Sequence, residues 1–207
     1  MASGYFQIVF VVFFGMIKKI NCTILLFLMV FGQLIAQKTE TCIIKTSLGD
    51  ITVELYPKQA PKTVANFLSY VDAHLYDNTT FFRSVRLNNQ PRDSIKIEVI
   101  QGGDVDSSKE LAPIPLETTR ETGLRHVNGT LSMARSRPNT ATCNFFICIN
   151  DQASLDFGGK RNKDGQGFAA FGKVIAGMDV VKKIQDLYPE QGQYFKPPVP
   201  ILSISRK

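Results

Sequence analysis

Histidine and cysteine, on which nucleophilic and metal-assisted chemistry most often depends, are scarce in this sequence. Its 207 residues include two histidines and four cysteines, and no G-x-S-x-G, H-E-x-x-H or Cys₂His₂ spacing occurs. His74 lies near the end of a predicted helix, where we expect a surface or capping residue, and His126 lies in a Gly/Asn-rich turn. The sequence therefore argues against hydrolysis and against a metal site.

Three of the cysteines, Cys42, Cys143 and Cys148, follow residue 36. Their odd number argues against a disulfide framework, and Cys143 and Cys148 lack the CxxC spacing of redox and zinc sites. We expect all three to be small buried residues. No pattern in the sequence indicates a cofactor.

A block of basic residues is also lacking. Residues 1–36 contain two lysines and no acidic residue, so the remaining 171 residues carry 22 basic and 18 acidic groups, a net charge of +4. This is an ordinary charge for solubility, spread along the chain. Nucleic acid is therefore not expected as a partner.

The first 36 residues have the layout of an export signal. From Met16 onward, a short basic start is followed by an apolar stretch that ends near Ala36. This order is typical of a secretory signal peptide. We predict a signal peptide over residues 1–36, beginning at Met16 if the gene start is over-extended, and a folded domain over residues 37–207.

An uncleaved membrane anchor is the alternative for this segment. Residues 20–36 are barely long enough to span a bilayer, which needs about 20 apolar residues. Asn21 and Gln33 also interrupt the apolar run. Cleavage is the preferred prediction, and it leaves the mature chain without membrane attachment.

The rest of the sequence consists of short apolar runs bounded by turn residues, which is typical of an all-β sandwich or barrel. Thr41–Thr46 and Ile51–Tyr56 flank Ser47–Asp50, a pattern that predicts a hairpin. Further strands are predicted at 80–85, 95–101, 129–134, 144–149, 169–175 and 199–205. Eight strands are enough to close a barrel, which removes exposed edges.

Two segments have apolar residues at helical spacing instead. One begins at Pro61, which suits a first helical turn, and extends to Leu75. The other runs from Gly177 to Leu187. We expect these amphipathic helices to cover the two open ends of the barrel. Two polar segments, 86–94 and 156–167, are predicted to be exposed loops.

Six short motifs resemble, in their order, those of the cyclophilin family. They are F-F-R at 81–83, Q-G-G-D at 101–104, G-T-L-S-M-A at 129–134, P-N-T at 138–140, N-F-F-I at 144–147 and F-G-K-V at 171–174. The resemblance covers residues 41–205 and is greatest to secreted and periplasmic bacterial members. It implies a closed eight-stranded antiparallel barrel capped by two α-helices, a mainly β fold that agrees with the pattern of apolar runs.

This resemblance implies a peptidyl-prolyl cis–trans isomerase, which accelerates rotation of X-Pro peptide bonds. Its partners would be proline-containing polypeptides, and its role would be to assist the folding of exported proteins. We expect a periplasmic monomer, with an N-terminally anchored form as the alternative.

Arg83 matches the position of the family's catalytic arginine. Amide resonance sets the barrier to rotation at about 18–20 kcal/mol. A cation that donates a hydrogen bond to the prolyl nitrogen breaks this resonance, because the nitrogen lone pair becomes available as the bond twists. A guanidinium suits this task, since it is always charged and carries several donors. Gln101 would orient the substrate carbonyl or Arg83.

The resemblance also implies a substrate-binding surface. Phe146, Leu155 and Ala134 would line an apolar pocket for the proline ring. Asn144 stands where the family often has a glutamine, and backbone groups near Arg135 and Ser136 would pair with the substrate backbone. The remaining predicted substrate-binding residues are Phe82, Val99 and Phe168.

Four positions depart from the family pattern. Phe82 and Phe168 stand where histidines are common. Glu98 lies three residues before Gln101, where an aromatic residue normally helps to form the proline pocket. Ser154 stands where Trp or Phe is frequent, and because the Trp position is associated with tight cyclosporin binding, we predict weak binding of this drug.

Two other classes of function remain open. A cyclophilin barrel could grip proline-containing segments without useful turnover, and Glu98 with the altered pocket favours this binding module. A β-barrel carrier of small apolar ligands would need a roomy apolar interior, whereas the abundant large residues of the predicted strands indicate a filled one.

Overall fold

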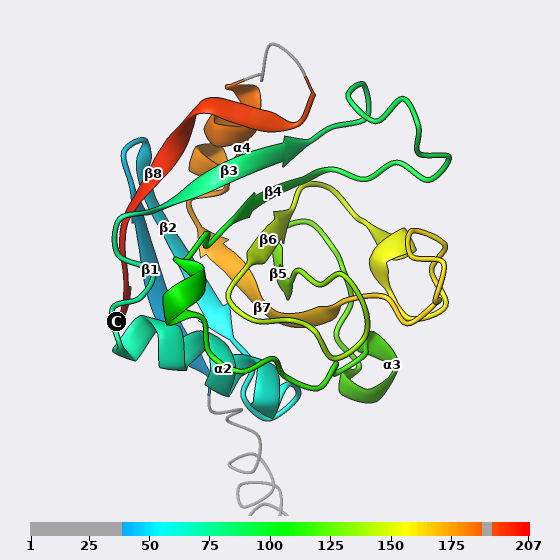
Figure 1. The fold of residues 1–207 in the computed structure, drawn as a ribbon, viewed down its shortest axis with the longest axis horizontal. Helices are drawn as coiled ribbons and strands as arrows, with labels where there is room; N and C mark the ends of the chain where they lie inside the picture. Colours follow the sequence, from blue (N-terminus) through cyan, green and yellow to red (C-terminus); the bar gives the residue numbers. More distant parts are fainter. Residues whose placement is uncertain (1–38, 188–191) are drawn as a thin grey trace, which may run out of the picture. The chain divides into compact units, whose positions relative to one another are not determined.

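Eight antiparallel strands close into a barrel in the order β1-β2-β7-β5-β6-β4-β3-β8 (Figure 1). The computed structural model describes residues 39–187 and 192–207, so the predicted signal peptide lies outside the described residues. The strands are β1 (Glu40–Thr46), β2 (Gly49–Leu55), β3 (Thr79–Val85), β4 (Val99–Gly102), β5 (Thr130–Met133), β6 (Phe145–Cys148), β7 (Ala169–Ala176) and β8 (Tyr194–Arg206). The mainly β barrel predicted from the sequence is confirmed.

The predicted strand at 95–101 is wrong in its first half, because β4 begins only at Val99. The side chain of Gln90 takes the place of a strand partner for Ile97. Its Nε2 donates to the carbonyl of Ile97 at 2.8 Å, and its Oε1 accepts from the Ile97 amide at 3.2 Å. Gln90 is 1% exposed and Asn89 is also buried, so the prediction of a wholly exposed 86–94 loop is wrong at these two residues.

Two helices, α2 (Pro61–Asp72) and α4 (Met178–Asp186), lie at opposite ends of the barrel, as predicted (Figure 1). The carboxylate of Glu117 caps the start of α2, where it accepts from the amides of Lys62 at 3.1 Å and Thr63 at 2.8 Å. A distant residue thereby satisfies amides that have no partner inside the helix.

Helix α2 ends at Asp72, three residues before the predicted end at Leu75. His74 has a left-handed φ of 54°, and the amide of Leu75 turns back to the carbonyl of Tyr70. The His74 side chain is exposed and lies 3.2 Å from Asp77, which confirms its placement at the surface.

Three short helical segments were not predicted from the sequence. They are the 3₁₀ helix Ser107–Lys109, the α-helix α3 (Thr119–Thr122) and the 3₁₀ helix Ala153–Leu155. At the start of α3, Oε2 of Glu121 accepts from the amide of Thr118 at 2.8 Å and from its hydroxyl at 2.9 Å. This T-x-x-E pattern is a helix-start signal that the sequence did contain.

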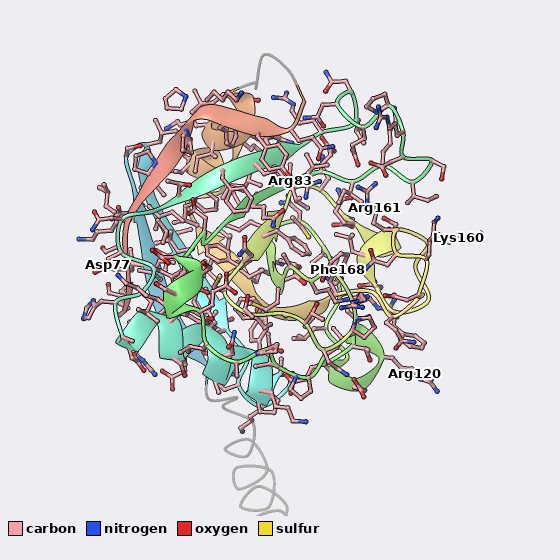
Figure 2. All side chains as sticks on the ribbon, in the orientation of Figure 1. Asp77, Arg83, Arg120, Lys160, Arg161 and Phe168 are labelled. Atoms are coloured by element: carbon pink, nitrogen blue, oxygen red, sulfur yellow. The ribbon has the colours of Figure 1, made fainter. Side chains whose placement is uncertain are left out.

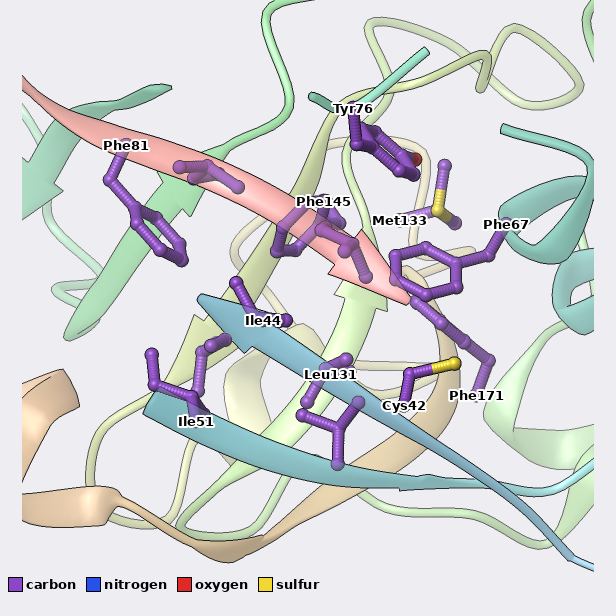
Figure 3. Packing of buried hydrophobic residues seen from close by; sticks show 14 of the residues in the cluster. Cys42, Ile44, Ile51, Phe67, Tyr76, Phe81, Leu131, Met133, Phe145 and Phe171 are labelled. Carbon is purple, nitrogen blue, oxygen red and sulfur yellow. The ribbon is translucent and has the colours of Figure 1, made fainter. Parts of the chain in front are cut away.

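Aromatic side chains fill the interior of the barrel (Figure 3). Phe145 packs edge-on against Phe67 and Tyr76, each with ring centroids 5.6 Å apart, and against Phe81 at 5.9 Å. An interior occupied in this way is not the roomy one that a carrier of apolar ligands needs.

The three predicted buried cysteines, Cys42, Cys143 and Cys148, are free and buried. Burial raises the pKa of the Cys42 thiol to about 11 and raises the pKa of the other two thiols as well. Because the thiolate is the reactive form, all three are poor nucleophiles in the folded protein.

Within residues 39–187 and 192–207, no helix combines the length and the apolar character needed to cross a bilayer.

Candidate active site

A β-bulge in β3 decides which way the side chain of Arg83 faces. Residues two apart on a strand normally share a face, so an unbroken β3 would turn Arg83 inward with Phe81. Phe81 pairs with Gly102 of β4. The preceding residue of β4, Gln101, pairs with Arg83, so β3 advances by two residues where β4 advances by one. The extra residue, Phe82, moves Arg83 to the outer face of the barrel.

Four neighbouring strands then place one residue each in a row on this outer face. Arg83 pairs with Gln101, Gln101 with Phe146 on β6, and Phe146 with Ser132 on β5. Directly paired residues of antiparallel strands share a face, with Cβ atoms about 4.5–5.5 Å apart. The row therefore brings a guanidinium, an amide and an aromatic ring together.

Two glutamine side chains hold the guanidinium of Arg83 (Figure 2 labels this residue). Its Nη1 donates to Oε1 of Gln101 at 3.0 Å. Its Nε donates to Oε1 of Gln193 at 2.9 Å, and Nη2 donates to the same oxygen. Burial lowers the pKa of Arg83, but a guanidinium stays charged in proteins.

The ring of Tyr194 lies beside this cation, 5.9 Å from the guanidinium carbon of Arg83. It also stacks on Phe82, with ring centroids 6.4 Å apart. Phe82, predicted to bind substrate, therefore lies beside Tyr194 and outside the apolar cluster described next. Gln193 and Tyr194 belong to none of the motifs, so sequence reasoning missed both.

A second hydrophobic cluster lies on the outer wall, apart from the barrel core. It contains Val85, Ile97, Val99, Phe146, Cys148 and Leu155, with Ala134 and Phe168 packed against it. Five predicted substrate-binding residues are thus brought together, namely Val99, Ala134, Phe146, Leu155 and Phe168. The rings of Phe146 and Phe168 meet edge-on at 5.3 Å, and Figure 2 labels Phe168.

Glu98 does not belong to this cluster. Its Oε2 accepts from Nδ2 of Asn150 at 2.9 Å. The cluster contains Ile97 instead, which the sequence analysis did not single out. Adjacent residues of an extended segment face opposite ways. A shift of one residue relative to the family pattern therefore places Ile97, rather than Glu98, in the apolar cluster. The interpretation of Glu98 as pocket lining is therefore wrong.

Ser136 and Asn144, also predicted to bind substrate, lie outside the apolar cluster. The exposed Ser136 has its Oγ 3.2 Å from Oγ1 of Thr140. Asn144 Nδ2 donates to the sulfur of Cys143 at 3.2 Å, while the carbonyl of Asn144 accepts from the amide of Ala134 at 2.8 Å. Neither side chain is part of the apolar cluster, although the backbone of Asn144 bonds to Ala134, which packs against it.

Arg135 is turned away from the row. Its Nε donates to the carbonyl of Gly167 at 2.8 Å, its Nη1 lies 2.8 Å from Asp164, and its side chain is 1% exposed. The hydrogen bond from Arg135 lowers the pKa of Asp164. The guanidinium also lies 5.2 Å from the ring centroid of Phe168, so Arg135 fastens the 156–167 segment beside the cluster.

Arg161 joins this segment to the loop that follows β3. Its Nη2 lies 3.2 Å from Oδ2 of Asp93, and its Nη1 donates to the carbonyl of Ile95. The Arg161 side chain is only 13% exposed. Segments 86–94 and 156–167, which are separate loops in the sequence, are therefore joined by Arg161 beside the site.

A buried chain of polar groups supports the apolar cluster from beneath. His126 Nδ1 lies 2.8 Å from Asp156 Oδ1, His126 Nε2 lies 2.9 Å from Ser132 Oγ, and the imidazole stacks on Phe146 at 6.0 Å. Burial raises the pKa of Asp156, but the hydrogen bonds from His126 outweigh it and leave that pKa lowered. Ser132 is 0% exposed, so this chain positions Phe146 and does not attack a substrate.

The arrangement offers a held cation beside an apolar surface. Such a site can grip a proline ring and place a charged donor near its nitrogen. Among the described residues, no group of three or more His, Cys, Asp or Glu is placed to hold a metal ion.

Comparisons with known proteins bear on the family and the fold. The family profile described as "Cyclophilin type peptidyl-prolyl cis-trans isomerase/CLD" matches residues 41–206. The chain is 39% identical over 170 residues to a peptidyl-prolyl cis–trans isomerase of Acinetobacter baylyi, covering 79% of this chain and 83% of that protein. It is 36% identical over 143 residues to peptidyl-prolyl cis–trans isomerase B of Escherichia coli, covering 68% and 80%.

A solved structure shows the same fold. The cyclophilin-type isomerase of Cryptosporidium parvum, crystallised in the presence of the dipeptide Ala-Pro, superposes with a TM-score of 0.66 at 24% identity. The match covers 81% of this chain and 99% of that one. The family profile and the relatives show that the chain belongs to the cyclophilin-type peptidyl-prolyl cis–trans isomerases.

Proposed function

We propose that this isomerase acts on X-Pro bonds of exported polypeptides and that Arg83 lowers the rotation barrier. The observation that carries the proposal is the bulge at Phe82, which turns a half-buried guanidinium, held by two glutamines, onto the outer face beside Gln101 and Phe146. A bulge that re-aims one side chain is typical of active sites.

The chemistry needs no nucleophile and no net proton transfer. As the X-Pro bond twists, the prolyl nitrogen gains an available lone pair, and a donor from Arg83 stabilises that state more than the planar ground state. Each 1.4 kcal/mol of such preferential stabilisation accelerates exchange about tenfold. Gln101 holds Nη1 of Arg83 at 3.0 Å and so fixes the direction of the donors.

The apolar cluster supplies the proline-binding surface. Phe146, Leu155, Val99, Ala134 and Phe168 present the apolar area against which a pyrrolidine ring would pack. Burying one such ring contributes roughly 1.5–3 kcal/mol to binding.

Export to the periplasm is the second part of the proposal. It rests on the signal-peptide pattern of residues 1–36, which precedes the first strand of the barrel at Glu40. Mass spectrometry of the exported protein tests it. An N-terminus at or near Gln37 supports a cleaved signal, whereas a mature protein that retains Met16 contradicts it.

The competing hypothesis of a binding module without turnover is weakened. Its main argument was an acidic side chain in the proline-binding surface, and Glu98 instead contacts Asn150. Weak cyclosporin binding remains part of the proposal, because Ser154 occupies the position where the family often has Trp.

An isomerisation assay on an Ala-Pro peptide tests the proposed role of Arg83. We expect wild-type protein to accelerate exchange, Arg83→Ala to lose roughly 100-fold in kcat/KM, equal to about 2.7 kcal/mol, and the exposed Arg92→Ala to match wild type. Equal rates for wild type and Arg83→Ala would leave the binding module as the better account.

A further inference from the structure

We infer that Gln193 is a positioning residue for Arg83, an inference that rests on the proposed role of this arginine. Gln193 lies just before β8, far from the motifs that define the site in the sequence. Its side-chain oxygen accepts from two nitrogens of Arg83, while Gln101 accepts from the third. The guanidinium is thus held at two of its edges.

The amide of Gln193 can present only its oxygen to Arg83. Its Nε2 donates to the carbonyl of Asn89 at 3.1 Å. If the Gln193 amide were flipped, its NH₂ group would face the N–H donors of Arg83, and its oxygen would face the carbonyl oxygen of Asn89. Neither contact could form a hydrogen bond, so the network selects one orientation of the amide. The acceptor that faces Arg83 is therefore fixed by its own environment.

The backbone of Gln193 is fixed as well. Its carbonyl accepts from the amide of Ser84, the residue after Arg83, at 2.8 Å. Asn89, whose carbonyl holds the Gln193 amide, donates from Nδ2 to the carbonyl of Ser84 at 2.9 Å. Arg83, Gln193 and Asn89 therefore form one closed set of contacts between β3, the loop after it and the start of β8.

This set leaves part of the guanidinium available for substrate. An arginine side chain carries five N–H donors. Three are engaged by the two glutamines. The other two, one on Nη1 and one on Nη2, have no acceptor among residues 39–187 and 192–207. They are the donors that could reach a prolyl nitrogen, and Gln193 determines where they point.

An amide suits this position better than a carboxylate. Both would accept the two hydrogen bonds, but a carboxylate would add a negative charge in direct contact with the cation. The resulting ion pair would weaken the hydrogen bond that Arg83 donates to the substrate. The stabilisation of the twisted state depends on a positive charge that no neighbouring anion compensates.

Three variants of the full chain test the inference in the Ala-Pro isomerisation assay. We expect Gln193→Ala to lower kcat/KM about tenfold, equal to about 1.4 kcal/mol, with KM within about twofold of wild type. Gln193→Glu keeps the size and an oxygen that accepts from Arg83 but loses the donor to the Asn89 carbonyl, and it should lose at least as much. Lys196→Ala, which changes an exposed residue near the start of β8, should match wild type.

Two further measurements separate positioning from a structural role. In the Arg83→Ala background, Gln193→Ala should cause no further loss, since it acts through Arg83. The Nε–H resonance of Arg83 in a ¹⁵N–¹H spectrum should shift and exchange faster with water in Gln193→Ala, while the backbone spectrum of the barrel stays unchanged.

The outcomes are distinct. Wild-type activity in both Gln193→Ala and Gln193→Glu, or equal losses from Gln193→Ala with and without Arg83, would overturn the inference and leave the proposed function intact. An Arg83→Ala protein as active as wild type would instead overturn the proposed role of Arg83.

Discussion

The two faces of strands β4 and β6 have different tasks, although their residues alternate along the same short segments. On the inner face, Ile100 and Phe145 belong to the barrel core. On the outer face, Gln101 and Phe146 belong to the site beside Arg83. Both faces are largely buried, because the loop after β3 and the 156–167 segment lie against the outer one.

This comparison shows how stability and function can be separated at neighbouring positions. The inner face is packed on all sides, so its residues contribute chiefly to the free energy of unfolding. The outer face keeps the polar groups of Arg83 and Gln101 beside apolar residues, so changes there should alter turnover or substrate binding more than folding.

The adjacent pair Phe145 and Phe146 should give the largest contrast. Phe145→Ala should lower the free energy of unfolding by about 3–5 kcal/mol, as expected for a core cavity, with kcat/KM of the folded protein nearly unchanged. Phe146→Ala should cost only about 2 kcal/mol of stability and lower kcat/KM at least tenfold. Urea denaturation and the isomerisation assay measure both. A larger loss of kcat/KM in Phe145→Ala than in Phe146→Ala would contradict the assignment of stability to the inner face and function to the outer face.

The buried support of the outer face should show in its pH dependence. Asp156 has a pKa lowered from its ordinary 3.8, so its stabilising effect is present above about pH 4 and is lost as the pH falls through its folded-state value. Asp156→Asn should lower the free energy of unfolding by about 2 kcal/mol at pH 7. Denaturation curves should show this difference shrinking below about pH 4; a difference that grows toward low pH would contradict the account.

Ile97 and Glu98 offer a smaller, sharper contrast. Ile97→Ala should raise KM for a proline peptide about tenfold, close to 1.4 kcal/mol, because it removes part of the apolar surface. Glu98→Ala is the matched control and should leave KM within about twofold. Steady-state kinetics would refute the placement of these side chains if Glu98→Ala had the greater effect.

Ser154 should give the smallest effect. Ser154→Trp adds apolar surface at the position that the family resemblance connects with cyclosporin, so inhibition should strengthen by about fivefold, near 1 kcal/mol. Inhibition curves for wild type and variant measure this. Tight inhibition of the wild type, unchanged by the substitution, would show that Ser154 does not limit drug binding.

The sequence was sufficient for the barrel because alternating apolar runs and helical spacing are local patterns. It also identified Arg83, Gln101 and Phe146, whose pairing across β3, β4 and β6 follows from the fold. The register at Glu98 was not predictable, because a buried side chain, that of Gln90, replaces a strand partner there. A side chain that takes the place of a strand partner leaves no periodic pattern in the sequence.

Contacts between distant segments were missed for the same reason. Gln193 meets Arg83 across 110 positions of sequence, and Arg161 meets Asp93 across 68. Neither residue stands in a motif, and each acquires its role only when the barrel closes. The start of α3 is a different case, because its T-x-x-E pattern is a local helix-start signal that the sequence itself contains.

Exchange spectroscopy on a bound Ala-Pro peptide tests the central claim most directly, because it measures rotation separately from binding. At saturating protein, Arg83→Ala should bind the peptide with a Kd within about threefold of wild type and should slow cis–trans exchange of the bound peptide roughly 100-fold. An unchanged exchange rate in Arg83→Ala would contradict the claim that this guanidinium lowers the barrier to rotation.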